Sequence, residues 1–329
     1  MLKKENPKKD QFATLSKERD CEQASPNFDH EGNKINFISL GCPRNLVDSE
    51  VMLGILLQAG YEVAPTLEEA DYLVINTCGF LEVSRQESMD TVRDVLKQRK
   101  ENAKLIVTGC MVQTHNESLK QTFPGIDYLL GSGDVEGILK AVQSTQKGEM
   151  VSTARSYLEV GEVPRRLSTP KHFAYLKIAE GCRKRCAYCV IPTIKGPLKS
   201  KSKEQIMKEF NILLNQGVKE IILIAQDLGD YGKDQGAKKL TALLDLLKTI
   251  LETEKNFWLR LLYLYPDEIT DDLITLMKSD KRICPYLDMP IQHINNQILK
   301  SMRRMTSKED IIAILTKLRR EVPEVSIIA

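Results

Sequence analysis

Three cysteines lie close together in the segment EGCRKRCAYCVIP, residues 180–192. They are Cys182, Cys186 and Cys189, with three and then two residues between them. Thiolate sites that hold iron–sulfur centres or structural zinc usually provide four ligands, so one ligand is missing here. Three thiolates can hold three irons of a 4Fe-4S cube and leave the fourth iron open to a small molecule. An open coordination position would make that iron a reactive centre.

A zinc knuckle is the alternative interpretation, in which His172 or a distant residue completes a Cys3His site. The spacing, the aromatic Tyr188 before the last cysteine, and the position directly after the predicted strand FAYLKIA favour the open iron site. Sites of open α/β sheets and of barrels lie at the carboxyl ends of their strands. This combination resembles the radical S-adenosylmethionine signature, in which the open iron chelates the amino and carboxylate groups of S-adenosylmethionine.

A second set of three cysteines is spread more widely, at Cys42, Cys78 and Cys110. Each follows the end of a predicted strand by one or two residues, in INFISLGC, DYLVINTC and KLIVTGC. Carboxyl ends of neighbouring parallel strands lie side by side, so we expect the three cysteines to converge in one crevice. The alternative is three small buried hydrophobic side chains, because free cysteine is often buried. Each cysteine has a glycine neighbour that would let the backbone approach a bulky cofactor: Gly41, Gly79 and Gly109.

Other candidate residues have weaker support. Cys21 and Cys284 have no partner at ligand spacing, and we assign them no role. Polar residues also follow two later strands and could face the same cavity, where they would contact S-adenosylmethionine or substrate. Capping of the following helices explains such residues equally well. These residues are Gln226, Asp227, Gln292 and His293.

The predicted elements place both sets of cysteines at sheet edges. Residues 35–149 alternate short β-branched runs with amphipathic stretches, which predicts parallel strands joined by crossover helices. Residues 150–172 contain two prolines and no steady period, so we expect a linker. Residues 173–329 repeat βα units and end on their fifth predicted strand, which indicates a partial (β/α) barrel. The polar residues 1–34 predict a disordered tail.

Composition limits the classes of function. The 329 residues include 47 basic and 45 acidic side chains, a balance too even to indicate a protein that depends on phosphate neutralisation. The apolar runs are strand-length and the lysine-rich N-terminus has no apolar stretch behind it, so we expect no membrane span and no secretory signal. We therefore expect a cytoplasmic protein. Its eight cysteines are then better explained as metal ligands or catalytic groups than as disulfides.

Several segments together resemble the methylthiotransferase family. They are ISLGCPRNLVDSE, NTCGF, TGC and IAEGCRKRCAYCVIP, continued by AQDLGDYGKD, RLLYLYPDEITDDLI and YLDMPIQH. The resemblance therefore runs from about residue 35 to the end. The opening LGCPRNLVDSE and the AQD and LLYLYP segments resemble the branch that modifies a ribosomal protein. The branch that modifies transfer RNA usually has YGCQMN in the first position.

The resemblance implies a fold, an activity and cofactors. The fold is an N-terminal parallel α/β methylthiotransferase domain followed by a radical S-adenosylmethionine barrel. The activity is transfer of a methylthio group to the β-carbon of an aspartate in small-subunit ribosomal protein S-twelve. Two 4Fe-4S clusters are implied: Cys182, Cys186 and Cys189 would hold the one that binds S-adenosylmethionine. An auxiliary cluster that carries the sulfur would be held by Cys42, Cys78 and Cys110.

The resemblance also implies an electron donor, such as flavodoxin or ferredoxin, and a sulfur donor. Two alternatives stay open at this point: a transfer RNA adenosine methylthiotransferase, and a non-catalytic zinc or iron–sulfur binding module.

The sequence differs from the family pattern in two places. The family usually has arginine where this chain has Lys195, Lys199 and Lys201, and lysine lacks the bidentate fork of arginine. The alternative for this lysine-rich loop is an ordinary solvated surface. The family also completes its barrel and adds a small β-barrel called TRAM. We therefore expect a barrel truncated at the C-terminus and a chain from which the TRAM domain is absent.

Overall fold

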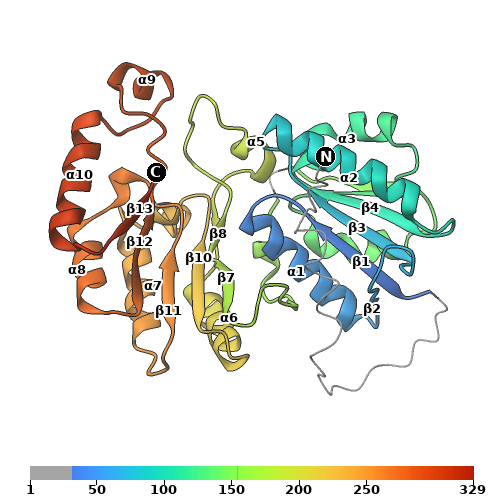
Figure 1. The fold of residues 1–329 in the computed structure, drawn as a ribbon, viewed down its shortest axis with the longest axis horizontal. Coiled ribbons are helices and arrows are strands. Elements are labelled where there is room, and N and C mark those ends of the chain that lie inside the picture. The colour runs from blue at the N-terminus through green and yellow to red at the C-terminus, as the bar shows by residue number, and fades with distance from the viewer. Residues whose placement is uncertain (1–31, 154) are drawn as a thin grey trace, which may run out of the picture. The chain divides into compact units, whose positions relative to one another are not determined.

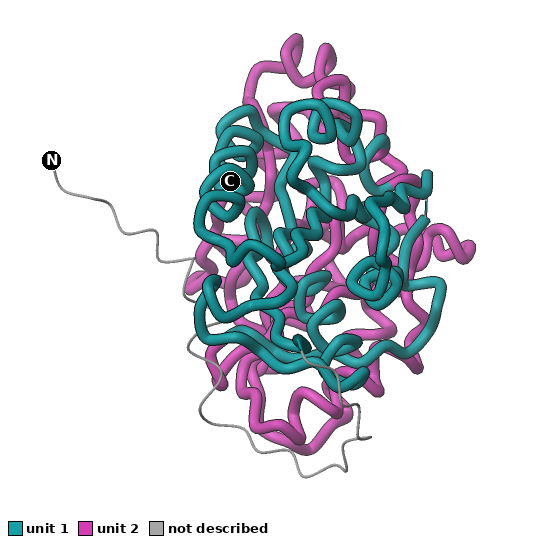
Figure 2. Tube along the Cα trace, turned by 90° about the vertical axis from the view of Figure 1, so that its right-hand side faces the viewer, with its two compact units in different colours: residues 1–169, 193–195 teal, residues 170–192, 196–329 magenta. Residues whose placement is uncertain are grey.

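The computed structural model describes residues 32–153 and 155–329, which form two compact units (Figures 1 and 2). Unit 1 runs to Thr169 and also includes residues 193–195, whereas unit 2 comprises residues 170–192 and 196–329. The predicted tail lies almost entirely outside the described residues, as does Cys21. The segment 150–172, expected to be a linker, groups with unit 1 as far as Thr169, and its Tyr157 and Leu158 are buried in the core of that unit.

Unit 1 contains a six-stranded sheet in the order β2-β1-β3-β4-β5-β6, and every pair in it is parallel. The alternation of strands and helices predicted for this region is confirmed, and the short edge strand β6 is an addition. The elements are β1 (Lys34–Ser39), α1 (Pro43–Gln58), β2 (Glu62–Val63), β3 (Tyr72–Thr77), α2 (Glu82–Gln98), β4 (Lys104–Gly109), α3 (Cys110–Thr122), β5 (Tyr128–Gly131), η2 (Val135–Gly137), α4 (Ile138–Gln143), β6 (Gly148–Met150) and η3 (Tyr157–Val160).

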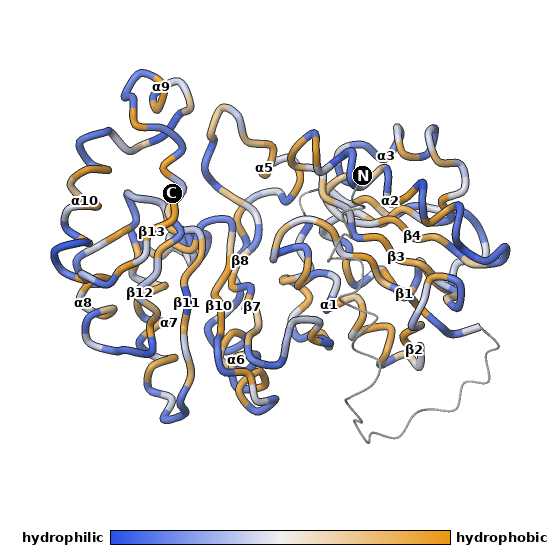
Figure 3. Tube along the Cα trace, viewed as in Figure 1, coloured by the Kyte–Doolittle hydropathy of each residue, from blue (hydrophilic) through white to orange (hydrophobic). Residues whose placement is uncertain are grey.

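The sheet of unit 1 is buried on both faces. Successive side chains of a strand point to opposite faces, so Ile106 packs on one side while Leu105 and Val107 pack on the other. Helices α1 and α4 supply the rest of the first core, and α2 and α3 supply the second. Burial on both sides explains why these strands read as near-continuous hydrophobic runs, which Figure 3 shows along β3 and β4.

Register aligns the ends of three strands. Ser39 of β1 pairs with Asn76 of β3, and Thr77 of β3 pairs with Gly109 of β4. Because the strands are parallel and adjacent, the residues that follow them leave the sheet at one edge.

Unit 2 contains a five-stranded parallel sheet in the order β13-β12-β11-β10-β7, and a separate antiparallel pair, β8-β9. The predicted fold class, two parallel α/β arrays, is confirmed. The elements are β7 (Phe173–Lys177), β8 (Ala179–Glu180), β9 (Lys199–Ser200), α6 (Lys203–Asn215), β10 (Glu220–Ile224), η4 (Leu228–Asp230), η5 (Lys233–Gln235), α7 (Thr241–Leu251), β11 (Trp258–Leu261), η6 (Pro266–Glu268), α8 (Asp271–Ser279), β12 (Ile283–Asp288), α9 (Asn296–Ser301), α10 (Lys308–Glu321) and β13 (Ser326–Ile328). The short helix α5 (Ile191–Lys195) is divided, because its residues 193–195 group with unit 1.

Helix α6 shows how the sequence sets an element of unit 2. Ser202 and Gln205 form a capping box that satisfies free backbone N–H groups and starts the helix. The buried face of α6 carries Phe210, whose ring meets the ring of Phe257 edge-on at 5.1 Å between centroids.

No helix within residues 32–153 and 155–329 has both the length and the apolar character that crossing a bilayer requires.

Candidate cluster-binding sites

The structure brings Cys42, Cys78 and Cys110 together at the carboxyl edge of the unit 1 sheet. A Cβ added to Gly41 would lie 3.2 Å from the sulfur of Cys78. The Cys110 thiol donates a hydrogen bond to Asn45 Oδ1 at 3.4 Å, and Asn45 lies in the first turn of α1, directly after Cys42. Cysteines 68 positions apart in the sequence therefore share one neighbourhood.

Helix starts determine part of the electrostatics of this site. Cys42 is the N-cap of α1 and Cys110 is the first residue of α3, positions where the helix dipole favours negative charge. Burial raises the pKa of Cys42, but the Arg44 guanidinium and backbone N–H groups outweigh it, so the net pKa lies below its ordinary value. Burial raises the pKa of Cys110 to about 12, and the Lys195 ammonium opposes this rise.

A network of hydrogen bonds holds the three loops. The Asn45 amide donates to Leu40 O at 3.2 Å and to Thr77 O at 2.9 Å, so it links the ends of β1 and β3. Asn76 donates in turn to Asn45 O at 2.9 Å. The Cys78 N–H donates to Ser88 Oγ at 3.1 Å, which fixes the third loop on α2. Such support orients ligands before a metal centre binds.

Lys195 completes the polar surroundings of Cys110. Its ammonium is buried, with side-chain exposure of 3%, and lies 3.0 Å from Asp48 Oδ2. It also donates to Ser132 O at 3.0 Å, while the Ser132 hydroxyl donates to Ile194 O at 3.1 Å. The expectation of a solvated lysine loop is wrong for Lys195. It is also wrong for Lys201, which is buried and paired with Glu209 at 2.5 Å.

The three glycines beside these cysteines have a different role from the one expected. We expected room for a bulky cofactor, but each glycine closes on protein atoms. Gly109 has φ +99°, and a Cβ there would lie 2.2 Å from Asn76 Oδ1. A Cβ on Gly79 would lie 2.9 Å from the backbone of Cys110. The absence of side chains therefore lets the cysteine loops pack on one another.

The second cysteine set lies in one loop of unit 2, after β7 and the short β8. The Cys182 N–H donates to Gly196 O at 3.2 Å, and the Cys189 N–H donates to Cys186 O at 3.1 Å. The Lys184 N–H donates to the Cys182 sulfur at 3.4 Å. All three cysteines are half-buried and none of them is in a disulfide. Burial raises the pKa of Cys182 to about 11, against the effect of the Lys184 N–H.

His172 does not complete this set. It directly precedes β7, and its carbonyl accepts from the N–H groups of Lys219 and Glu220 where β10 begins. The cysteines follow the other end of β7, and a strand of five residues spans about 16 Å. The Cys3His alternative with this histidine is therefore wrong.

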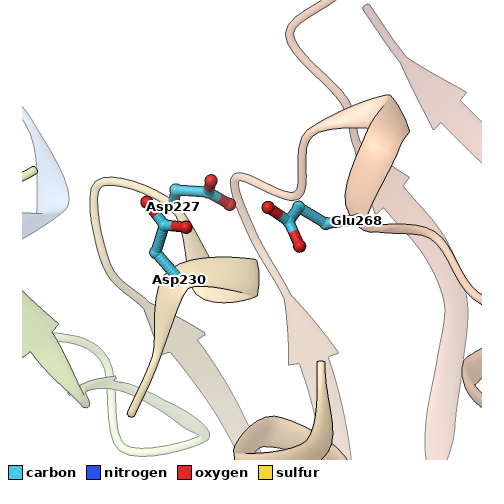
Figure 4. A group of neighbouring side chains, drawn as sticks. All are labelled: Asp227, Asp230 and Glu268. Carbon is cyan, nitrogen blue, oxygen red and sulfur yellow. The ribbon is translucent and has the colours of Figure 1, made fainter. Parts of the chain in front are cut away.

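Three carboxylates lie near the cysteine loop of unit 2 (Figure 4). The ligand atoms of Asp227, Asp230 and Glu268 lie within 4.8 Å of one another, which is close enough for a metal ion. Two lysines already neutralise them: Lys184 Nζ lies 2.7 Å from Asp227, and Lys233 Nζ lies 2.9 Å from Asp230 and 2.7 Å from Glu268. The group is thus an ion-pair network that ties the cysteine loop to the ends of β10 and β11. Burial raises the pKa of Asp227 to about 6, with Lys184 opposing.

A cavity of about 290 Å³ adjoins Cys186. Its lining includes none of the strand-end residues Gln226, Asp227, Gln292 and His293, so this cavity does not decide between the two explanations of those residues. Asp227 caps η4 by accepting from the Gly229 N–H at 3.0 Å. The cavity is lined by Lys184, Arg185, Cys186, Tyr265, Asp267, Arg303, Arg304 and Met305.

Sequence reasoning missed Arg304 and Tyr265 as neighbours of the cysteine loop. Tyr265 lies in the LLYLYP segment that carried the family resemblance, which was a usable signal. Nothing in the sequence distinguishes Arg304 from the exposed Arg303 beside it.

The residues present fit iron–sulfur clusters at both sites. Each site offers three cysteines outside any disulfide, and thiolates are soft ligands suited to such clusters. Each also has support for the sulfurs, from helix N-termini in unit 1 and from the Lys184 N–H in unit 2.

Comparison with known proteins defines the class first. Residues 34–131 match the family described as "Uncharacterized protein family UPF0004", and residues 176–329 match the radical SAM superfamily. Two solved structures share this architecture. The radical S-adenosylmethionine methyltransferase TsrM from Kitasatospora setae, with cobalamin and a [4Fe-4S] cluster bound, covers 90% of this chain and 68% of its own, with a TM-score of 0.62 and 14% identity. The cobalamin-dependent S-adenosylmethionine radical enzyme OxsB covers 90% of this chain and 49% of its own, with a TM-score of 0.58 and 13% identity.

Curated relatives then define the family. A protein of Protochlamydia amoebophila named ribosomal protein uS12 methylthiotransferase RimO is 83% identical over 99% of this chain and 69% of its own length. Proteins of the same name are 63% identical in Chlamydia caviae and 47% identical in Pelotomaculum thermopropionicum, over 90% and 89% of this chain and 64% and 66% of their own lengths. The chain belongs to the RimO family of methylthiotransferases. It spans about two thirds of the length of these relatives.

Proposed function

We propose that this chain is a radical S-adenosylmethionine methylthiotransferase that adds a methylthio group to the β-carbon of an aspartate in ribosomal protein uS12. One observation carries the proposal: two separate cysteine triads lie at the carboxyl edges of two parallel sheets. The relatives named as uS12 methylthiotransferases support the choice of reaction and substrate.

Each triad has a distinct task in this proposal. Cys182, Cys186 and Cys189 hold a 4Fe-4S cluster with one iron left for S-adenosylmethionine, and a second 4Fe-4S cluster belongs to the triad of unit 1. When bound, these groups supply one-electron reductive cleavage of the sulfonium and the sulfur for transfer. The chain itself binds and orients the groups through its thiolates, its helix N-termini and the Lys184 N–H.

The number of ligands favours clusters over single zinc ions. Structural zinc takes four ligands in a tetrahedron, and each site offers three cysteines. Three thiolates can hold three irons of a 4Fe-4S cube and leave the fourth iron open.

The proposal also includes the partners that the reaction needs. These are uS12 as substrate, an electron donor such as flavodoxin or ferredoxin, and a sulfur donor. A cytoplasmic location follows from a ribosomal substrate and from free cysteines that must stay reduced.

Iron and sulfide analysis tests the two sites. After anaerobic reconstitution, we expect the Cys42→Ala, Cys78→Ala, Cys110→Ala variant to lose about half of the iron, because one of two four-iron centres is removed. The matched Cys182→Ala, Cys186→Ala, Cys189→Ala variant should lose the other half. A colourless wild-type protein that contains zinc and no iron would contradict the proposal and leave only a structural module.

The substrate is tested by mass spectrometry. The reconstituted chain is supplied with S-adenosylmethionine, a reductant, sulfide as the sulfur donor, and either uS12 or unmodified transfer RNA. We expect uS12 to gain the mass of one methylthio group in place of a hydrogen, at one aspartate, and transfer RNA to stay unchanged. Modification of transfer RNA instead would establish the alternative activity.

A further inference from the structure

We propose that Arg304 is a positioning residue for Cys186 and raises the reduction potential of the cluster in unit 2. The inference rests on the proposed function, because it concerns the cluster assigned to Cys182, Cys186 and Cys189. It concerns a residue that belongs neither to the sequence motifs nor to the ion-pair network of Asp227, Asp230 and Glu268.

Three contacts hold the Arg304 guanidinium. Its Nη1 lies 3.9 Å from the sulfur of Cys186, within hydrogen-bond distance for a sulfur acceptor. Its Nη2 donates to Pro290 O at 2.5 Å, and its central carbon lies 3.9 Å from the centre of the Tyr265 ring. The residue is buried, with 8% exposure. Pro290 follows β12 and Tyr265 follows β11. The segments after these two strands therefore orient the Arg304 guanidinium toward the Cys186 sulfur.

The backbone next to Arg304 contacts the same loop. The Ala187 N–H, directly after Cys186, donates to Met302 O at 3.1 Å. Between these two contacts, Arg303 has φ +57° at the C-terminal end of α9, where the Arg304 N–H donates to Leu299 O at 2.9 Å in a Schellman cap. The segment Met302–Arg304 therefore holds the cysteine loop at two points.

The charge of Arg304 is available to the sulfur. Lys184 also lies over the Tyr265 ring, at 3.9 Å, but its ammonium is paired with Asp227 and Glu268. Within the part of the chain that the structure describes, no carboxylate lies at ion-pair distance from Arg304; its partners are a carbonyl, an aromatic ring and Cys186.

The physical consequence of this contact is a higher reduction potential of the cluster in unit 2. Reduction adds one negative charge to a cluster, and a buried cation that donates to a ligand sulfur stabilises that charge. Hydrogen bonds to the sulfurs and nearby charge are among the factors that set these potentials. Lysine keeps the charge but cannot donate to Cys186 and Pro290 in the planar arrangement that arginine provides.

The experiment uses the full-length chain carrying Cys42→Ala, Cys78→Ala and Cys110→Ala, so that one cluster gives the signal. In this background, Arg304→Met, Arg304→Lys and the control Arg319→Met are reconstituted anaerobically. Arg319 is an exposed arginine of α10 that does not line the cavity beside Cys186, so its replacement removes the same charge where water screens it. The midpoint potential is measured by redox titration monitored by electron paramagnetic resonance, without S-adenosylmethionine.

We expect Arg304→Met to lower the equilibrium constant for reduction about tenfold, which for a one-electron couple is about 59 mV toward more negative potential. Arg304→Lys should lie between this value and that of the parent, and Arg319→Met should match the parent. Equal potentials for Arg304→Met and Arg319→Met would overturn the inference. If Arg304→Met holds no iron, Arg304→Lys tests the inference instead. A potential equal to that of the parent would then overturn it. Absence of a 4Fe-4S signal from the parent would instead overturn the proposed function.

Discussion

At the scale of single residues, a side chain that the sequence places on the surface can instead form a buried ion pair. Lys195 lies in a lysine-rich loop, yet its ammonium is buried against Asp48 beside Cys110. A carboxylate that loses a buried cationic partner remains charged in a poorly solvated place, which costs more than loss of the attraction alone. Lys195 therefore contributes to the stability of unit 1 as well as to the field at the cysteines.

We expect Lys195→Met to lower the free energy of unfolding of unit 1 by about 3 kcal/mol, the cost of breaking a buried ion pair from one side. Removal of both charges, in Asp48→Asn with Lys195→Met, should recover much of that loss because no charge is then left buried. Urea unfolding of Lys195→Met, Asp48→Asn and the double variant, compared with the parent, forms a double-mutant cycle. Additive losses would show that the two side chains are not coupled.

Glu50 gives a second test at this scale. Its buried carboxylate accepts from Arg165 at 2.6 Å and from the Ser168 N–H at 2.6 Å, which fastens the end of unit 1 to α1. Glu50→Gln should cost about 3 kcal/mol in urea unfolding. The exposed pair Glu82 and Arg85 supplies the control, where Glu82→Gln should cost less than about 1 kcal/mol. Similar losses for the two variants would mean that burial does not strengthen the Glu50 contacts.

At the scale of elements, the sequence predicts the strands and the convergence of the unit 1 cysteines well. Parallel strands buried on both faces leave continuous apolar runs, and parallel topology brings their carboxyl ends to one edge. The contacts made by Lys195 and Arg304 could not be predicted this way. Lys195 lies 147 positions from Asp48 and Arg304 lies 118 from Cys186, and no local pattern encodes a partner at such separations. Strands of two residues, such as β8 and β9, are also too short to show an alternating hydrophobic pattern in the sequence.

The glycine at the end of β4 tests the packing of the cysteine loops. Gly109→Ala would place a Cβ 2.2 Å from Asn76 Oδ1, whereas Gly217 has a similar φ of +87° and nothing within 4 Å. Both variants should lose about 1 kcal/mol from left-handed strain, and Gly109→Ala should lose at least about 2 kcal/mol more because Asn76 must move. Only Gly109→Ala should also lose iron from the unit 1 site, measured after anaerobic reconstitution. Equal stability and equal iron for the two variants would contradict this assignment.

At the scale of the whole molecule, the two sheets share no strand, and different helices contact each sheet: α1 and α3 in unit 1, and α6 and α8 in unit 2. Cooperative unfolding follows shared cores, so each unit should open with its own free energy. Phe210→Ala removes a fully buried ring from unit 2 and should cost about 3–5 kcal/mol, and Leu105→Ala should cost about 2–5 kcal/mol in unit 1.

Hydrogen exchange of the full chain, followed by mass spectrometry of its peptides, separates these effects. Phe210→Ala should speed exchange at least about 100-fold in the strands of unit 2 and leave β3 and β4 protected, because 1.4 kcal/mol corresponds to tenfold in an opening equilibrium. Leu105→Ala should give the reverse pattern. If either substitution speeds exchange equally in both sheets, the chain opens as one cooperative body. Cluster loss at one site would then weaken the other site as well, and the iron remaining in each triple cysteine variant would fall well below half.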